Sequence, residues 1–191
     1  MLASLLNVTL RTLLLRAGPQ DFPFDPRLTM PLALFAGAVN AAMFAQVLPV
    51  GSAVPMAAAL IAGLALITRT LLRMRKLEAR YQQTFAALLA TNALLTLALI
   101  PLFMQVAPVF KLIAENPTLL EQPDAVKMPQ GIAFVMNVLN LWSFVVTASI
   151  FRHAANLSLG VGFLLAFFSA FSLLMFVGVA GAIAGVIFGG P

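Results

Sequence analysis

The 191-residue sequence contains no cysteine and a single histidine, and charged residues make up only 9% of it. Without cysteine the chain can form neither a disulfide nor a thiolate metal site. Because only His153 is present, a site with several histidines cannot form within one chain. We therefore expect neither a metal nor a cofactor.

Common catalytic motifs are also missing. The sequence has no G-x-S-x-G nucleophile elbow, no H-E-x-x-H helix, no P-loop and no dinucleotide-binding glycine pattern. His153 follows Arg152 directly, next to a long apolar run, which favours an interfacial role over catalysis. We expect a protein that is not an enzyme. A weaker alternative is a lipid-modifying enzyme, which would need a pocket that joins His153 to Glu78.

Hydrophobic residues are abundant and make up 62% of the chain. Ordinary globular proteins are about 45–50% apolar and about 25% charged, so a soluble fold of this length would expose too much apolar surface. The composition predicts an integral membrane protein with one all-α domain, a polytopic bundle of transmembrane helices.

The first 29 residues are predicted to form a short amphipathic helix and a proline-rich linker. Ser4, Asn7 and Arg11 recur on one side of the helix over residues 2–16, and leucines lie largely on the other. This helix is too short and too polar to span a bilayer, so it lies either in the membrane interface or against the spans. Arg11 lies inside the apolar run and no A-x-A-like cleavage site follows, so we interpret the segment as retained.

Residues 30–188 are predicted to contain five membrane spans. They cover about residues 30–48, 53–68, 85–109, 131–151 and 157–188. The turn signal at residues 49–52 makes the first two spans an antiparallel hairpin. Pro101 should kink the third span. The longest polar segment, residues 110–129, follows it, and the last run is too long for one crossing but too short for two.

Positive charge is distributed unevenly between the loops of this topology. If the amino terminus is cytoplasmic, nine of the eleven Lys and Arg residues lie on the cytoplasmic side, and only Lys111 and Lys127 lie on the other. This asymmetry is a strong positive-inside signal. It predicts a cytoplasmic amino terminus and a carboxyl terminus outside, in the inner membrane of a bacterium.

Five basic residues are concentrated between the second and third spans. They are Arg69, Arg73, Arg75, Lys76 and Arg80. We expect this cluster to bind anionic lipid headgroups, to which each Lys or Arg near the surface adds about 1 kcal/mol. Nucleic acid is not an expected partner, because the charge is sorted by topology and no aromatic or basic groove motif accompanies it.

No ionisable residue falls near the centre of any predicted span, which weighs against a pump or an ion-coupled carrier. Amide side chains are present instead: Asn92 in the third span, and Asn137 and Asn140 in the fourth. Asn137 and Asn140 lie three residues apart, so both should point into the bundle. They either form ordinary interhelical hydrogen bonds, which we favour, or line an intramembrane polar pocket.

Small residues recur every four positions in two of the spans. Gly181, Gly185 and Gly189 form one such series, and Gly37 belongs to an alanine-rich series in the first span. Small residues let helix backbones approach closely in a membrane. The series predict helix packing, within the chain in preference to self-association between chains.

The spans and connectors resemble the Yip-domain family of small polytopic membrane proteins. The stretches that carry the resemblance are residues 141–143, Phe151 with Arg152, and residues 157–160. The linker at residues 18–23 looks like that of small proteobacterial inner-membrane proteins. The resemblance covers about residues 30–188 and implies five spans with an uncharacterised bacterial role. Eukaryotic members are associated with Rab GTPases, but the cytoplasmic region involved has no counterpart here, so that function is not carried over.

The sequence as a whole predicts a non-enzymatic scaffold or accessory subunit that organises lipids or other membrane proteins. The alternative is a small oligomeric transporter or channel subunit with a polar path lined by Asn92, Asn137 and Asn140. A continuous hydrated cavity that reaches the middle of the membrane would favour the alternative, and a tightly packed centre would exclude it.

Overall fold

The structure, a computed structural model, describes residues 2–116, 118–119 and 129–188. These residues form helices and no strand, which confirms the predicted all-α class. The α-helices are α1 (Leu2–Leu13), α2 (Pro26–Phe44), α3 (Val50–Met74), α4 (Tyr81–Glu115), α5 (Gln130–Ala155) and α6 (Leu159–Phe188). Two short 3-10 helices, η1 (Pro19–Asp21) and η2 (Glu78–Arg80), lie in the connectors.

Five of these helices are long and apolar enough to cross a membrane. The shortest, α2, has 19 residues, which at about 1.5 Å per residue gives nearly the ~30 Å of a hydrocarbon core. The chain therefore has the architecture of an integral membrane protein with several spans, as the composition predicts. α1, with 12 residues, is too short to cross.

The second span is longer at both ends than predicted. α3 begins at Val50, so the expected turn at residues 49–52 is misplaced and the chain turns at residues 45–48 instead. Pro49 is the N-cap of α3, where its missing N–H costs nothing because the first turn of a helix has no partner for it. At the other end, α3 continues through Arg69 and Arg73, which shortens the predicted basic connector.

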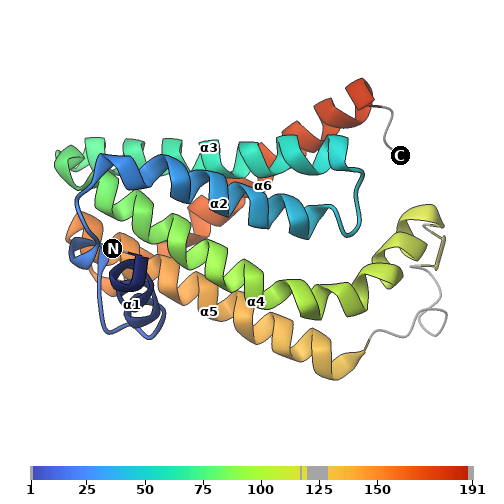
Figure 1. Ribbon diagram of the computed structural model, residues 1–191, viewed down its shortest axis with the longest axis horizontal. Coiled ribbons are helices and arrows are strands. Elements are labelled where there is room, and N and C mark those ends of the chain that lie inside the picture. The colour runs from blue at the N-terminus through green and yellow to red at the C-terminus, as the bar shows by residue number, and fades with distance from the viewer. Residues whose placement is uncertain (1, 117, 120–128, 189–191) are drawn as a thin grey trace.

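α4 continues to Glu115, so the first part of the predicted polar segment is helical. The helix contains Pro101 and Pro108, and Figure 1 shows that it changes direction in its second half. A proline removes one backbone hydrogen bond and crowds the preceding turn, which explains such a bend. Glu121, Asp124 and Lys127, from the same polar segment, lie outside the described residues.

The five long helices form an antiparallel bundle that is packed mainly at one end. α2 and α3 form the predicted hairpin, and α6 packs on both α3 and α5. Figure 1 shows α4 and α5 close to the other long helices where α4 begins, and separated from α2 and α3 towards the opposite end. The buried core follows this shape, since Leu64, Phe85, Leu89 and Phe151 all lie in the packed half.

The closest helix approach in this packed half is made by Gly162. A Cβ atom at this position of α6 would lie 2.7 Å from the carbonyl oxygen of Ala148 on α5, so only glycine fits. Gly162 belongs to neither of the two small-residue series in the sequence. It resembles the small-residue contacts that let membrane helices pack without a hydrophobic driving force between them.

The predicted glycine series contributes less to packing than expected. Gly181 packs against Met56 of α3, because a Cβ atom added at Gly181 would lie 3.1 Å from the Met56 sulfur. A Cβ atom added at Gly185 would meet nothing within 4 Å. Gly189 lies outside the described residues. In the first span, a Cβ at Gly37 would lie 3.8 Å from Ile61, which is ordinary contact and requires no glycine.

α1 lies crosswise on the bundle and is seen nearly end-on in Figure 1. It packs against α4, and the indole Nε1 of Trp142 on α5 donates a hydrogen bond of 2.9 Å to the carbonyl of Leu13. The buried face carries Leu5, Val8, Thr9 and Thr12.

The rest of α1 presents an exposed apolar stripe beside an exposed polar one. Leu6, Leu10 and Leu14 form the apolar stripe, and Ser4, Asn7 and Arg11 form the polar one. A helix with three such faces suits the membrane interface while it is docked on a protein. The two predicted placements of this segment are therefore compatible with each other.

Candidate functional site at the basic end of the bundle

Most of the charge in the chain lies at the packed end of the bundle, which we call the basic end. α2 begins there, α3 ends there, α4 begins there and α5 ends there (Figure 1). Nine Lys and Arg residues and three Asp and Glu residues lie in α1 and in these helix ends and connectors, which gives 9 − 3 = +6. At the opposite end, the described part of the chain carries only Lys111 and Glu115.

Four members of the predicted headgroup-binding cluster are exposed at this end: Arg69, Arg73, Arg75 and Lys76. They lie along the last turns of α3 and just beyond it. Long basic side chains at a helix end can extend to the headgroup region while their stems stay beside apolar surface. Their position therefore fits the predicted role.

Arg80, the fifth member, has a different environment. It is only partly exposed, and its Nη1 donates to the carbonyl of Ala154 at 3.1 Å and to Oδ1 of Asn156 at 3.0 Å. A longer contact of 3.3 Å reaches the carbonyl of His153. The last carbonyls of a helix lack intrahelical partners, and a cation there also interacts favourably with the helix dipole. Arg80 therefore holds the end of α5 against the start of α4.

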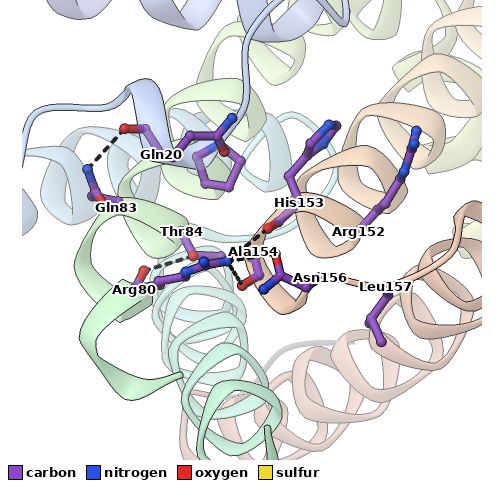
Figure 2. A pocket seen from close by; sticks show the side chains of 10 residues that line it. Gln20, Arg80, Gln83, Thr84, Arg152, His153, Ala154, Asn156 and Leu157 are labelled. Atoms are coloured by element: carbon purple, nitrogen blue, oxygen red, sulfur yellow. Dashed lines mark hydrogen bonds between the residues drawn. The ribbon is translucent and has the colours of Figure 1, made fainter. Parts of the chain in front are cut away.

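A pocket of about 380 Å³ lies beside this contact (Figure 2). Arg80 of η2 with Gln83 and Thr84 of α4 lines one side, and the end of α5 with the following residues lines another. Pro19 and Gln20 of η1 complete it. We call it the basic pocket, because its lining includes Arg80, Arg152 and His153 and no carboxylate.

Two local contacts fix the walls of the basic pocket. Gln83 Nε2 donates to the carbonyls of Gln20, at 3.2 Å, and Phe22, at 2.8 Å, so the linker is tied to α4. His153 Nδ1 lies 2.7 Å from the carbonyl oxygen of Ser149, one turn back on α5. With Nδ1 used in this way, Nε2 is the ring nitrogen left for other partners.

Glu78 lines a different hollow, of about 560 Å³, together with Arg69, Arg73 and Tyr81. His153 and Glu78 thus line separate cavities. Within the described residues, no group of three or more His, Asp or Glu side chains is placed to hold a metal ion.

A further cavity of about 210 Å³, the central cavity, lies between α3, α4, α5 and α6. Its polar lining consists of Thr91, Asn92, Asn140, Ser143, Thr147 and Ser169. The structure thus brings Asn92 and Asn140 to one cavity, as the polar-pocket hypothesis requires. Asn137 does not line it and is exposed, so the prediction that both asparagines of α5 point into the bundle is wrong for this residue. Asn140 lines the cavity and is itself exposed.

The basic pocket and the central cavity share no lining residue. On α4, Phe85 and Ala87 lie between the two linings, and on α5, Ile150 and Phe151 do so; all four are at most 4% exposed. A packed apolar layer therefore separates the centre of the bundle from its basic end. Such a layer would block a continuous polar path in this conformation.

Several residues of the basic pocket were not singled out as binding residues from the sequence: Gln20, Gln83, Arg152, His153 and Asn156. Gln83 contacts a carbonyl that is 63 positions away in the chain, and no local pattern reveals such a contact. Arg152, His153 and Asn156 were visible as a short polar connector. Their juxtaposition with Arg80 depends on the tertiary packing of α4 against α5.

Comparison of the chain with protein-family models, with curated proteins and with solved structures gave no match. The resemblance to the Yip-domain family therefore stays a prediction. The function has to be argued from the geometry of the basic end and of the central cavity.

Proposed function

We propose that this chain is a non-enzymatic protein of the bacterial inner membrane that organises anionic lipids, and through them other membrane proteins, at its basic end. The observation that carries the proposal is the charge of +6 at the packed end of a five-helix membrane bundle. The Arg and Lys side chains at the end of α3 are exposed and free to reach headgroups.

The expected strength of the interaction follows from these exposed charges. Each Lys or Arg near an anionic membrane surface contributes about 1 kcal/mol, which weakens at high salt. Arg69, Arg73, Arg75 and Lys76 together would enrich anionic lipid around α3 strongly. α1 adds an exposed leucine stripe and Arg11 at the same end.

The proposal includes an orientation, with the amino terminus in the cytoplasm and the carboxyl terminus outside. The chain has no cysteine, so single cysteines report topology cleanly. We expect a membrane-impermeant maleimide to label Lys111→Cys in intact cells, and Arg75→Cys only after permeabilisation. Labelling of Arg75→Cys in intact cells would overturn the orientation.

Lipid preference can be measured by reconstitution into nanodiscs that contain equal amounts of phosphatidylglycerol and phosphatidylcholine. Native mass spectrometry then counts the lipids of each kind that stay bound after release. We expect an excess of phosphatidylglycerol that a variant with Arg69, Arg73, Arg75 and Lys76 changed to Gln largely loses. Lys111→Gln, at the opposite end, should retain the excess.

Equal retention of both lipids by the unmodified protein would refute the proposed function. The cysteine labelling described above, repeated in each variant background, shows whether the altered chains insert correctly. Raising the salt concentration should reduce the excess, because the exposed charges are screened.

We also propose membership of the Yip-domain-like proteins. The support is the pattern of Trp142, Arg152 and Gly160 within a five-helix layout. This membership would make the chain a small polytopic organiser without chemistry of its own. It adds no residue to the site.

A second candidate function is passage of a small uncharged solute, which the central cavity favours. Asn92, Asn140 and Ser169 would provide hydrogen bonds, and no ionisable residue lines the cavity. Proteoliposomes can be tested by stopped-flow swelling in glycerol or urea. Faster entry that Asn140→Leu abolishes would support this function, and rates equal to empty liposomes would exclude it.

A further inference from the structure

We propose that the basic pocket binds a single phosphate group, held by Arg152, His153 and the free edge of Arg80. In the membrane this group would belong to one anionic lipid headgroup. The inference rests on the proposed function and deepens it, because it separates one specific site from the general attraction of the basic end.

The charge of the lining is the first argument. Two guanidinium groups and one imidazole reach the pocket from two helices, and no carboxylate lines it to neutralise them. Arginine presents a planar fork of donors that matches phosphate oxygens in a bidentate arrangement. An uncompensated cluster of this kind is attractive to an anion and not to a neutral solute.

The remaining donors are the second argument. Arg80 uses Nη1 for the end of α5, while its Nη2 and Nε have no hydrogen-bond partner among the described residues. His153 places Nε2 beside them, because its Nδ1 contacts Ser149, and Nε2 donates to an anion when the ring carries both protons. Arg152 is exposed and adds a second guanidinium from the adjacent position on α5.

Preorganisation is the third argument. Arg80 fixes α4 to α5, Gln83 fixes the linker to α4, and Asn156 adopts a left-handed conformation (φ 52°) that turns the chain at the edge of the pocket. Figure 2 shows Arg80 meeting Asn156 at the end of α5 and Gln83 reaching Gln20, with the side chains of His153 and Arg152 extending outward from the last turn of α5. A site whose walls are already held loses little conformational entropy when it binds a ligand.

Size agrees with a headgroup. The volume of about 380 Å³ is many times the roughly 10–15 Å³ that a single water molecule needs by the same measure. This space accepts a phosphate with its attached glycerol. Leu157 and Pro19 supply apolar wall beside the charged groups, which suits a molecule that is polar at one end.

The test compares two double variants in the nanodisc assay. Arg152→Gln with His153→Gln changes the pocket and removes one formal charge, and Arg73→Gln with Arg75→Gln removes two from the end of α3, outside it. We expect the pocket variant to lose one slowly exchanging phosphatidylglycerol, with at least a tenfold fall in its occupancy, and to keep the general anionic excess. The control variant should show the reverse.

Arg80 is left unchanged in this experiment, because its loss would also release α5. The melting temperature of each variant in detergent confirms that folding is intact. If both variants lose the same amount of bound phosphatidylglycerol, the specific site is overturned while the proposed function stands. If the unmodified protein shows no anionic excess, the proposed function fails.

A separate arm identifies the source of the phosphate. Inorganic phosphate is titrated against the protein in nanodiscs of phosphatidylcholine alone and followed by ³¹P NMR. Saturable binding that the pocket variant abolishes supports the phosphate site, even in the absence of an anionic lipid preference, and assigns it to a soluble anion. No phosphate binding together with no tightly held lipid overturns the inference.

Discussion

Asn40 on α2 donates its side-chain amide to Oδ1 of Asn92 on α4 at 2.8 Å, and the same amide nitrogen also reaches the carbonyl of Ala36. Asn40 lies 13 residues beyond Arg27 and Asn92 lies 12 beyond Arg80. At about 1.5 Å per residue, both amides lie some 18–20 Å from the basic end. The bond therefore joins two helices near the middle of the membrane, beside the central cavity.

The first prediction is that Asn40 and Asn92 are energetically coupled. Asn40→Val and Asn92→Val remove the same bond, so a double-mutant cycle should give a coupling of about 0.6 kcal/mol and at most about 1.7 kcal/mol, the range measured for such bonds in membranes. The cycle is measured by unfolding in mixed micelles. Strictly additive effects would show that the two amides do not support each other.

The second prediction concerns the crossing of α5 and α6. Gly162→Ala places a methyl group 2.7 Å from the carbonyl oxygen of Ala148, so the helices must separate. We expect a loss of about 1–3 kcal/mol in the free energy of unfolding, as for other overpacked sites. Gly178→Ala, on the same helix with nothing within 4 Å, should leave stability unchanged or raise it by up to about 1 kcal/mol, because alanine favours a helix over glycine. Similar losses in both variants would contradict this account.

The third prediction concerns the backbone at the end of α3. Lys76 adopts a left-handed conformation (φ 56°), and Leu77 N–H closes the helix end on the carbonyl of Leu72. This conformation costs free energy in any residue with a Cβ, because the Cβ crowds the backbone, and it costs none in glycine. Lys76→Gly should therefore raise the free energy of unfolding by about 0.5–1 kcal/mol. The measurement is the unfolding midpoint in detergent.

Arg75→Gly is the matched control for Lys76→Gly. It removes the same charge one position earlier, where the backbone is ordinary (φ −92°). There, glycine should lower the free energy of unfolding, because it raises the entropy of the unfolded chain and relieves no backbone strain in the folded one. Equal shifts in the two variants would mean that charge, and not backbone conformation, determines the effect.

The elements that the sequence predicts well are those that depend on local composition. Long apolar runs separated by prolines and charges are sufficient to predict a five-helix membrane bundle and the α2–α3 hairpin. The sequence predicts helix ends less well, because Pro49 reads as a turn residue and is in fact the N-cap of α3. Arg69 and Arg73 read as a connector and are helical, since arginine tolerates a helix end at the membrane surface.

Residues whose role depends on tertiary contact were harder to identify. In α1 the leucines form the apolar side of the predicted amphipathic helix, yet the buried face contains Thr9 and Thr12. Each hydroxyl donates to a carbonyl four residues earlier in its own helix, at 2.7 and 2.8 Å, so burial leaves neither unpaired. Arg80 likewise could not be told apart from its exposed neighbours, because its partners lie more than 70 positions away.

The last prediction uses Trp142 as a reporter of α1 docking. Trp142 is the only tryptophan of the chain, and its Nε1 donates to the carbonyl of Leu13 at 2.9 Å. Val8 is buried at the contact, so Val8→Arg should detach α1. Loss of the hydrogen bond and contact with lipid would shift the Trp142 emission to the blue and increase its quenching by brominated lipid chains.

Asn7→Arg adds the same charge to the exposed polar stripe of α1, one residue away, and should leave both the emission and the quenching unchanged. Deletion of residues 2–16 gives the Trp142 emission and quenching that are expected when α1 is completely detached. Because the reporter sits on α5, a shift in Val8→Arg that matches the deletion shows that the crosswise packing of α1 is set by its Leu5, Val8, Thr9 and Thr12 face. Identical spectra for Val8→Arg and the unmodified protein would place α1 away from α5 in the membrane.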